Sequence, residues 1–100
     1  MKIPAYKRWI KSQRCSLLGV GYVDPHHCGD FGTAKTNHDE WLVPLARLLH
    51  TSKTSSANKE YFRILAPKYF RKWFDTLTEK KQNKLLENSD VYAIMKVKCK

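Results

Sequence analysis

The chain has 100 residues, of which 42% are hydrophobic, and its mean hydropathy is −0.58. This length fits one domain with one small core, and the lack of a long apolar run excludes a membrane-spanning helix. The formal net charge is +10, with 19 Lys and Arg against 9 Asp and Glu. Such an excess favours a polyanionic partner, nucleic acid first, over a merely soluble basic surface.

The first quarter of the chain predicts a helix and a hairpin. Residues 5–13 have the pattern of a short basic helix with one apolar face. Residues 14–24 predict a β-hairpin, in which Gly19 and Gly21 permit the turn. The N-terminal segment has no apolar stretch of the kind found in a signal peptide, so we expect a cytoplasmic protein.

The middle of the chain predicts a polar loop followed by a helix. Residues 25–38 are polar and contain glycines, which is typical of a loop. Asp39 is a suitable N-cap for a helix over about residues 40–50. Pro44 lacks a backbone donor and fits best in a first helical turn, so the helix could instead begin near Pro44.

The second half predicts three more helices and a short strand. Helices are expected over residues 59–66 and 68–75, because a proline interrupts the pattern between them. Residues 76–79 have the spacing of a capping box, which predicts a last helix through about Glu87. Residues 91–97 alternate as a short strand does. We therefore expect an α+β fold in one domain spanning residues 1–100.

All four histidines of the chain fall between positions 26 and 50. Histidine is the commonest protein metal ligand and a natural general base near neutral pH. Neighbouring strand residues point to opposite sides, so one of His26 and His27 can bind a metal while the other faces a substrate. This layout suits phosphodiester hydrolysis, in which a divalent ion stabilises phosphate charge and an imidazole takes a proton from water. The alternative is that these are ordinary hydrogen-bonded histidines.

A wider pattern surrounds the histidine pair. Its members are Cys15 to Gly19, His26-His27, Gly32, Lys35, Asp39, Val43-Pro44-Leu45 and His50. This pattern resembles the core of the HNH, or ββα-metal, nuclease superfamily, and it is most similar to the compact Ref-like and YbcO-like proteins of phage recombination loci. The resemblance covers about residues 8–52, which is roughly half of the chain.

The resemblance implies a fold and an activity. It implies a compact ββα-metal (HNH-type) core over about residues 14–52, built from a β-hairpin and a helix, with a helical C-terminal extension over about 59–88. The implied activity is metal-dependent endonucleolytic cleavage of DNA, in recombination or defence inside a bacterial or phage-infected cell. One alternative is a non-catalytic DNA-binding or protein-interaction module on a degenerate HNH scaffold. Another is a small basic partner of a protein, without nucleic acid contact.

The resemblance also assigns roles to single residues. His26 and His50 match the positions of metal ligands, for Mg²⁺, Mn²⁺ or Zn²⁺. His27 matches the general base. Asp39 matches an acidic residue that orients the base or braces the loop. Lys35 would lie near the phosphate backbone of DNA, with a solvated loop lysine as the alternative.

One departure from the family concerns its structural zinc site. Many members hold zinc with two Cys-x-x-Cys pairs, but here Leu18, Ala46 and Leu49 stand at cysteine positions and only Cys15 remains. No structural zinc is therefore expected, and we predict that these three apolar side chains cluster in its place. Cys15 is expected to be a buried small hydrophobe, and Cys28 a bystander beside the histidine pair.

The region after residue 58 supplies aromatic and basic side chains. The aromatic residues between 61 and 74 recur at helical spacing, which favours core packing over stacking on bases. The basic residues between them would then face outwards and contact DNA phosphates, or form an ordinary solvated face. The residues concerned are Arg63, Lys68, Arg71 and Lys72.

Overall fold

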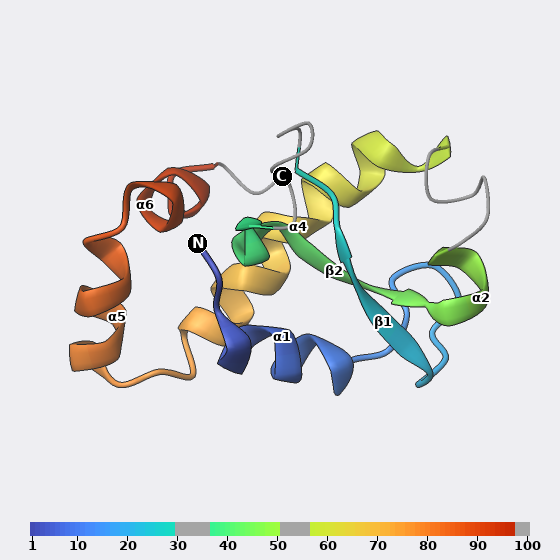
Figure 1. The fold of residues 1–100 in the computed structure, drawn as a ribbon, viewed down its shortest axis with the longest axis horizontal. Coiled ribbons are helices and arrows are strands. Elements are labelled where there is room, and N and C mark those ends of the chain that lie inside the picture. The colour runs from blue at the N-terminus through green and yellow to red at the C-terminus, as the bar shows by residue number, and fades with distance from the viewer. Residues whose placement is uncertain (30–36, 51–56, 98–100) are drawn as a thin grey trace.

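The computed structural model describes residues 1–29, 37–50 and 57–97. Strand β1 (Val23–His27) pairs in antiparallel fashion with β2 (Leu42–Ala46), and helix α2 (Arg47–His50) follows β2 directly (Figure 1). The register sets His26 opposite Val43 and His27 opposite Leu42. The fold is therefore α+β, and its central elements follow one another as strand, strand and helix.

The remaining described elements are helical. They are α1 (Pro4–Lys11), the 3₁₀ turn η2 (Asp39–Trp41), α4 (Lys59–Phe74), α5 (Glu79–Leu86) and α6 (Ser89–Met95). The predicted N-terminal helix is confirmed: it begins with a proline, which suits a first helical turn, and buries Tyr6 and Ile10 on one face. No helix in the described ranges is both long enough and apolar enough to cross a membrane.

The predicted hairpin over residues 14–24 is wrong, and of the helix expected over 40–50 or from near Pro44 only Arg47–His50 is helical. Only Val23 and Asp24 of the first segment belong to a strand, and its partner is the segment 42–46. All five residues of β2 are buried. A short apolar run without alternation does not distinguish a buried strand from a helix, which explains the error.

Helix α4 passes straight through a proline that we expected to interrupt it. Pro67 lies inside the sixteen-residue helix and removes one backbone hydrogen bond. Its side chain is fully buried, and its neighbours Phe62, Ala66 and Phe70 are buried on the same helix. Apolar burial of about 25 cal/mol per Å² across this face offsets the missing bond.

The C-terminal strand expected over residues 91–97 is also wrong, because this segment forms α6. The side chain of Asn88 accepts hydrogen bonds from the backbone N–H groups of Asp90 and Val91 and so caps the helix. Val91 and Ile94 are buried three residues apart, which is a helical spacing. The preceding helix α5 is confirmed, but the capping box predicted over residues 76–79 is wrong, because the N-cap is Thr78 and Glu79 follows it directly.

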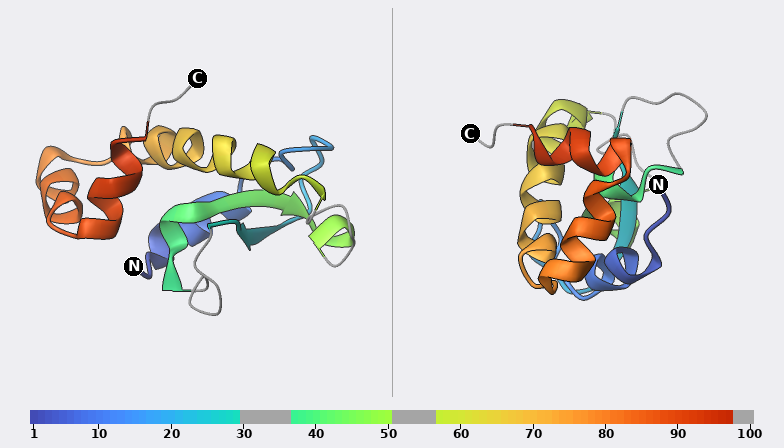
Figure 2. Two further views of the ribbon diagram at one scale, coloured as in Figure 1. Left: turned by 90° about the horizontal axis from the view of Figure 1, so that it is seen from above. Right: turned by 90° about the vertical axis from the view of Figure 1, so that its left-hand side faces the viewer.

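Two apolar clusters hold these elements together. One lies where α1, α4 and α6 meet and includes Tyr6, Phe70 and Ile94. The other lies between the sheet and α4 and includes Val43 and Phe62. Helix α4 runs along one face of the sheet and reaches both clusters, while α5 and α6 lie at one end of the molecule (Figure 2). The histidine pair of β1 therefore lies in a sheet that contacts both α1 and α4.

Candidate functional site

His27 and Asp39 meet at the end of the sheet. His27 is the last residue of β1, and Asp39 opens the turn that leads into β2. The His27 Nε2 atom lies 3.0 Å from Asp39 Oδ1, which is a hydrogen-bond distance. The His27 side chain is 14% exposed and that of Asp39 is 6% exposed, so the contact is shielded while the imidazole keeps an opening to solvent.

A second contact fixes the Asp39 carboxylate. Its Oδ2 atom accepts the backbone N–H of Ile3 at 2.7 Å. An ionised carboxylate can only accept, so the hydrogen bond to it requires that Nε2 of His27 carries the proton. A neutral His27 then has its lone pair on Nδ1. This is how a carboxylate fixes the tautomer and orientation of a histidine base.

His26 takes a different direction from its neighbour, as strand geometry requires. Its ring is half-buried and meets the edge or face of Phe62 on α4, with ring centroids 5.4 Å apart at an interplanar angle of 69°. Helix α4 thus supports the position that the resemblance assigns to a metal ligand.

Cys28, the next residue, has a structural environment. Its thiol donates to the carbonyl of Trp41 at 3.1 Å. Burial raises the pKa of Cys28 to about 12, although the charge of Arg63 acts in the opposite direction. The thiol therefore stays protonated at neutral pH, which makes Cys28 a poor metal ligand, because metals bind the thiolate.

Two residues of the predicted site cannot be placed. Lys35 and the side chain of His50 lie outside the described residues. The backbone of His50 ends α2, and this helix contacts β1. The shared metal ligation of His26 and His50 therefore stays a prediction.

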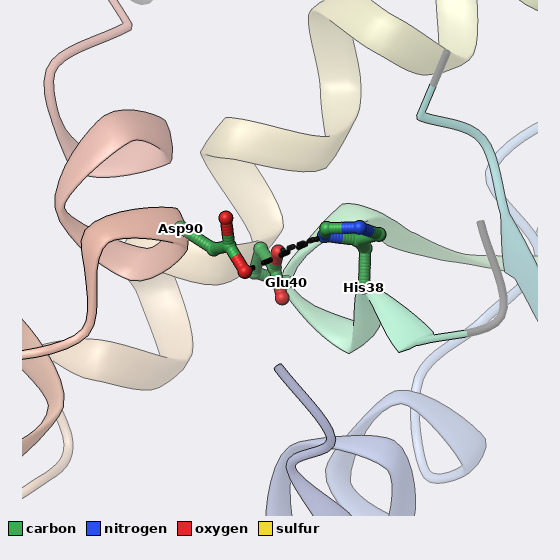
Figure 3. Close-up of side chains that lie close together, drawn as sticks. All are labelled: His38, Glu40 and Asp90. Atoms are coloured by element: carbon green, nitrogen blue, oxygen red, sulfur yellow. Dashed lines mark hydrogen bonds and ion pairs between the residues drawn. The ribbon is translucent and has the colours of Figure 1, made fainter. Parts of the chain in front are cut away.

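A second histidine–carboxylate group consists of His38, Glu40 and Asp90 (Figure 3). His38 Nδ1 lies 3.0 Å from Glu40 Oε1 and 3.7 Å from Asp90 Oδ2 on α6. The donor atoms of these three residues lie within 4.8 Å of one another, so they could hold a divalent cation. Glu40 is fully buried, and its Oε2 atom also meets the N-terminal ammonium of Met1 at 3.2 Å.

Our sequence interpretation missed this group. His38 and Glu40 flank Asp39 in the sequence, at a 3₁₀ turn that the sequence did not predict. Asp90 is fifty residues further along the chain, in a segment that we expected to be a strand. No local pattern connects such a residue to the turn.

The predicted apolar replacement of the zinc site is only partly present. Ala46 is buried and Leu49 packs against the same cluster, but Leu18 is 53% exposed, so the three do not cluster. The centre of this region is Cys15 instead. Its Sγ atom accepts the backbone N–H groups of Leu17, Leu18 and Ala46 at 3.4, 3.4 and 3.2 Å.

These bonds change the acidity of Cys15. Burial alone would raise its pKa, but the backbone N–H groups around the sulfur outweigh burial and lower the pKa below the ordinary value for a thiol. The three backbone N–H groups therefore surround the sulfur in an arrangement that would stabilise a thiolate. Among the described residues, no second cysteine shares this position.

The basic residues after position 58 divide into two kinds. Lys68 and Lys72 are exposed on α4 and can reach a phosphate backbone. Arg63 is half-buried and its Nη1 atom donates to Glu60 at 3.1 Å. Arg71 donates from Nη2 to the carbonyl of Met95 at 2.6 Å, which ties α4 to the end of α6. DNA contact by these four residues stays a prediction.

The aromatic residues of α4 follow the expected helical pattern. Core packing is confirmed for four of them: Phe62, Phe70, Trp73 and Phe74 are buried. Tyr69 is half-buried, and Tyr61 is 44% exposed. The buried rings support the sheet and α1, and do not form a platform for bases.

Comparison with known proteins gives relatives but no activity. No solved structure matches the chain. The "Uncharacterized protein YdfU" of Escherichia coli (strain K12) is 40% identical over 48 residues, which are 45% of this chain. The chain spans only 14% of the length of that protein. The model of the family described as "Protein of unknown function (DUF968)" matches residues 1–63, and because this is more than half of the chain, the chain belongs to the DUF968 family.

Proposed function

We propose that this protein is a metal-dependent endonuclease of the HNH type that hydrolyses phosphodiester bonds in DNA. One observation carries the proposal: the 3.0 Å contact between His27 Nε2 and Asp39 Oδ1 at the end of β1. The order of β1, β2 and α2 supports it, because it matches the strand–strand–helix order of the resembling superfamily.

The pair can act as an oriented general base. Nδ1 of His27 takes a proton from the attacking water, and the imidazole becomes positively charged. Asp39 stabilises this charge through the hydrogen bond to Nε2, and Ile3 holds the carboxylate in place from its other side. General-base assistance of this kind contributes typically about 10²–10⁴-fold in rate.

The proposed cofactor is a divalent cation, Mg²⁺, Mn²⁺ or Zn²⁺, held by His26 with His50. Such a cation stabilises negative charge on the scissile phosphate and on the leaving oxygen. Among these three ions the two imidazole nitrogens would fit Zn²⁺ best, because Mg²⁺ and Mn²⁺ prefer oxygen ligands. His26 lies next to the base in sequence but is turned towards α4, so its ring does not compete with His27 for the water.

DNA is the proposed partner because of charge. The formal net charge of +10 includes exposed lysines at positions 68 and 72 on α4. The relative in E. coli is compatible with action in the cytoplasm of a bacterial or phage-infected cell. If several phosphates are contacted, log affinity should fall linearly with log salt concentration.

The test is cleavage of supercoiled plasmid in the presence of each of the three metal ions. The wild type should convert the plasmid to open-circular or linear DNA, and His27→Ala should lose about 10²–10⁴-fold in rate. His27→Ala removes no positive charge from a neutral imidazole, so DNA binding should persist. An equal cleavage rate in the wild type and in His27→Ala, each purified free of host nucleases, would contradict the assignment.

A non-catalytic DNA-binding module is the second candidate. It is favoured by the loss of the zinc cysteines, because Leu18 occupies one of their positions and is 53% exposed. This candidate predicts salt-dependent DNA binding without cleavage in any of the three metal ions, and the same plasmid experiment decides between the two.

A further inference from the structure

One end of the molecule exposes several apolar side chains. Tyr22 is 89% exposed, Leu18 53% and Val20 41%, all in the segment 15–22, and Leu48 of α2 is 71% exposed. The backbone of Arg47 donates to the carbonyl of Tyr22, so this segment adjoins α2 (right-hand end of Figure 1). We call these four residues the apolar tip. Exposed apolar side chains gathered in one place mark an interaction site more often than isolated ones do.

The segment that carries the apolar tip is held by many bonds. Three backbone N–H groups bond to Cys15 Sγ. Both the backbone N–H and the hydroxyl of Ser16 donate to the carbonyl of Pro44 at 2.9 Å. Gly19 has a φ of +70°, which a residue with a side chain rarely adopts. The apolar side chains are therefore presented to solvent by an ordered backbone.

Two arginines accompany the apolar tip. Arg14 donates to the carbonyl of Gly19 at 3.1 Å and is exposed. Arg47 is 81% exposed and pairs with Asp24 at 3.3 Å. A partner for this surface must offer negative charge to the arginines and flat apolar area to the tip. The phosphates and open base faces of unpaired nucleic acid offer both, whereas an intact duplex hides its base faces.

We propose that the apolar tip binds unpaired bases of DNA, with Tyr22 as the stacking residue and Arg14 and Arg47 on the flanking phosphates. This inference rests on the proposed DNA partner and names the preferred substrate, which is DNA with a single-stranded or bulged segment. Aromatic stacking on bases is tolerant of sequence, so no sequence preference is expected at the tip.

The spacing along β1 connects the tip to the candidate active site. Tyr22 and His27 are five residues apart, which is about 17 Å in an extended strand. A DNA strand bound at both places would therefore have to span about 17 Å.

The experiment measures the fluorescence anisotropy of labelled oligonucleotides without added metal. The probes are a single strand, the matching duplex and a duplex with an unpaired bulge. Tyr22→Ala is compared with Tyr92→Ala, because Tyr92 is also an exposed tyrosine, 48% exposed, but lies on α6 at the other end of the molecule. Leu18→Ser serves as a second variant, and thermal unfolding verifies that all three remain folded.

The wild type should bind the single strand and the bulge more tightly than the duplex. Tyr22→Ala should bind the single strand about 5- to 150-fold more weakly, with little change on the duplex, and Tyr92→Ala should resemble the wild type. Equal affinities of Tyr22→Ala and the wild type for the single strand would overturn the proposal. So would a preference of the wild type for intact duplex, or binding to anionic lipid vesicles but to none of the DNA probes.

This measurement is independent of cleavage. A wild type that binds unpaired DNA through Tyr22 but cleaves no plasmid refutes the endonuclease and supports the tip. If the wild type cleaves plasmid in a His27-dependent way but Tyr22→Ala binds the single strand as tightly as the wild type, the endonuclease is supported and base binding by the apolar tip is overturned.

Discussion

The turn at residues 38–40 contributes to two histidine–carboxylate contacts on two sides of the molecule. On the side of β1, Asp39 holds His27 at 3.0 Å. On the side of α6, Glu40 holds His38 at the same distance, and Asp90 adds a second carboxylate at 3.7 Å. The difference lies in the further partners, because Asp39 accepts a neutral backbone N–H, whereas Glu40 and Asp90 both also contact the positively charged N-terminus of Met1.

This difference separates two roles that a histidine–carboxylate contact can have. The pair on the side of β1 joins His27 and Asp39, which are twelve residues apart, and leaves Nδ1 of His27 available to accept a proton. The group on the side of α6 joins the turn to a helix fifty residues away. We therefore expect substitutions on the first side to change the rate of cleavage, and substitutions on the second to change the stability of the fold.

The largest expected effect is on the cleavage rate. Asp39→Asn keeps the size of the side chain but can no longer require the proton on His27 Nε2, so most of the general-base contribution of about 10²–10⁴-fold should be lost. The double variant with His27→Ala should lose no more than His27→Ala alone, because the two residues act as a unit. Multiplicative losses in single-turnover cleavage of plasmid would show that Asp39 works through another residue.

The next effect is on stability and tests the side of α6. Glu40→Ala removes a fully buried carboxylate and leaves His38 without its closest partner. The free energy of unfolding should fall by about 3 kcal/mol, as expected when one member of a buried pair is removed. Urea denaturation measures this value. Glu87→Ala, an exposed change on the same side of the molecule, should stay within about 0.5 kcal/mol, and equal losses in the two variants would mean that burial of Glu40 is irrelevant.

A third effect appears only at alkaline pH and concerns Cys28, the neighbour of His27. Its pKa is raised to about 12 when folded, so the folded thiol stays protonated where the unfolded thiol ionises. The stability that this provides is fully present below the unfolded pKa of about 8.5, and about 1.4 kcal/mol should be lost per pH unit above it, up to the folded pKa.

Cys28→Ala removes this dependence, although Tyr6, whose pKa burial also raises, still contributes a loss of the same sign. The measurement is urea denaturation between pH 8 and pH 10 for both proteins. Parallel pH profiles would show that the Cys28 thiol is open to solvent.

The smallest effect tests whether α6 can be destabilised without disturbing the candidate active site. Asn88→Ala removes the side chain that caps α6 through two backbone N–H groups. The loss should be about 1 kcal/mol of unfolding free energy, and the cleavage rate at low temperature should be unchanged. A large drop in rate would show that α6 acts on His27 through the turn at 38–40, and the two sides would then be one unit.

The sequence allowed some of these features to be predicted, and the reasons differ from element to element. Helices α1 and α5 were predictable because their apolar spacing or capping residues are local. Strand β2 was not, because five buried residues in a row have no period. Helix α6 was missed because the residues of the segment 91–97 alternate as in a strand, although the buried positions Val91 and Ile94 have helical spacing.

The candidate site divides in the same way. Placing His27 and Asp39 together was within reach of the motif, because it contains both residues and they are only twelve positions apart. The group of His38, Glu40 and Asp90 was not, because its third member comes from a distant helix. The exposure of Leu18 was also beyond the sequence, since an apolar residue in a glycine-rich turn is buried or exposed according to tertiary packing.

The pairing of two prolines has a consequence for how this chain can change. Pro25 stands opposite Pro44. Neither proline has a backbone N–H, so a change of register that required a hydrogen bond from either residue would be unfavourable. Side chains alternate along a strand, so a single-residue insertion between Pro25 and His26 would send His26 and His27 to each other's sides of the sheet. Length variation before Val23 leaves the two histidines where they are. Changes in chain length around this sheet should therefore be acceptable outside the five residues of β1 and forbidden within them.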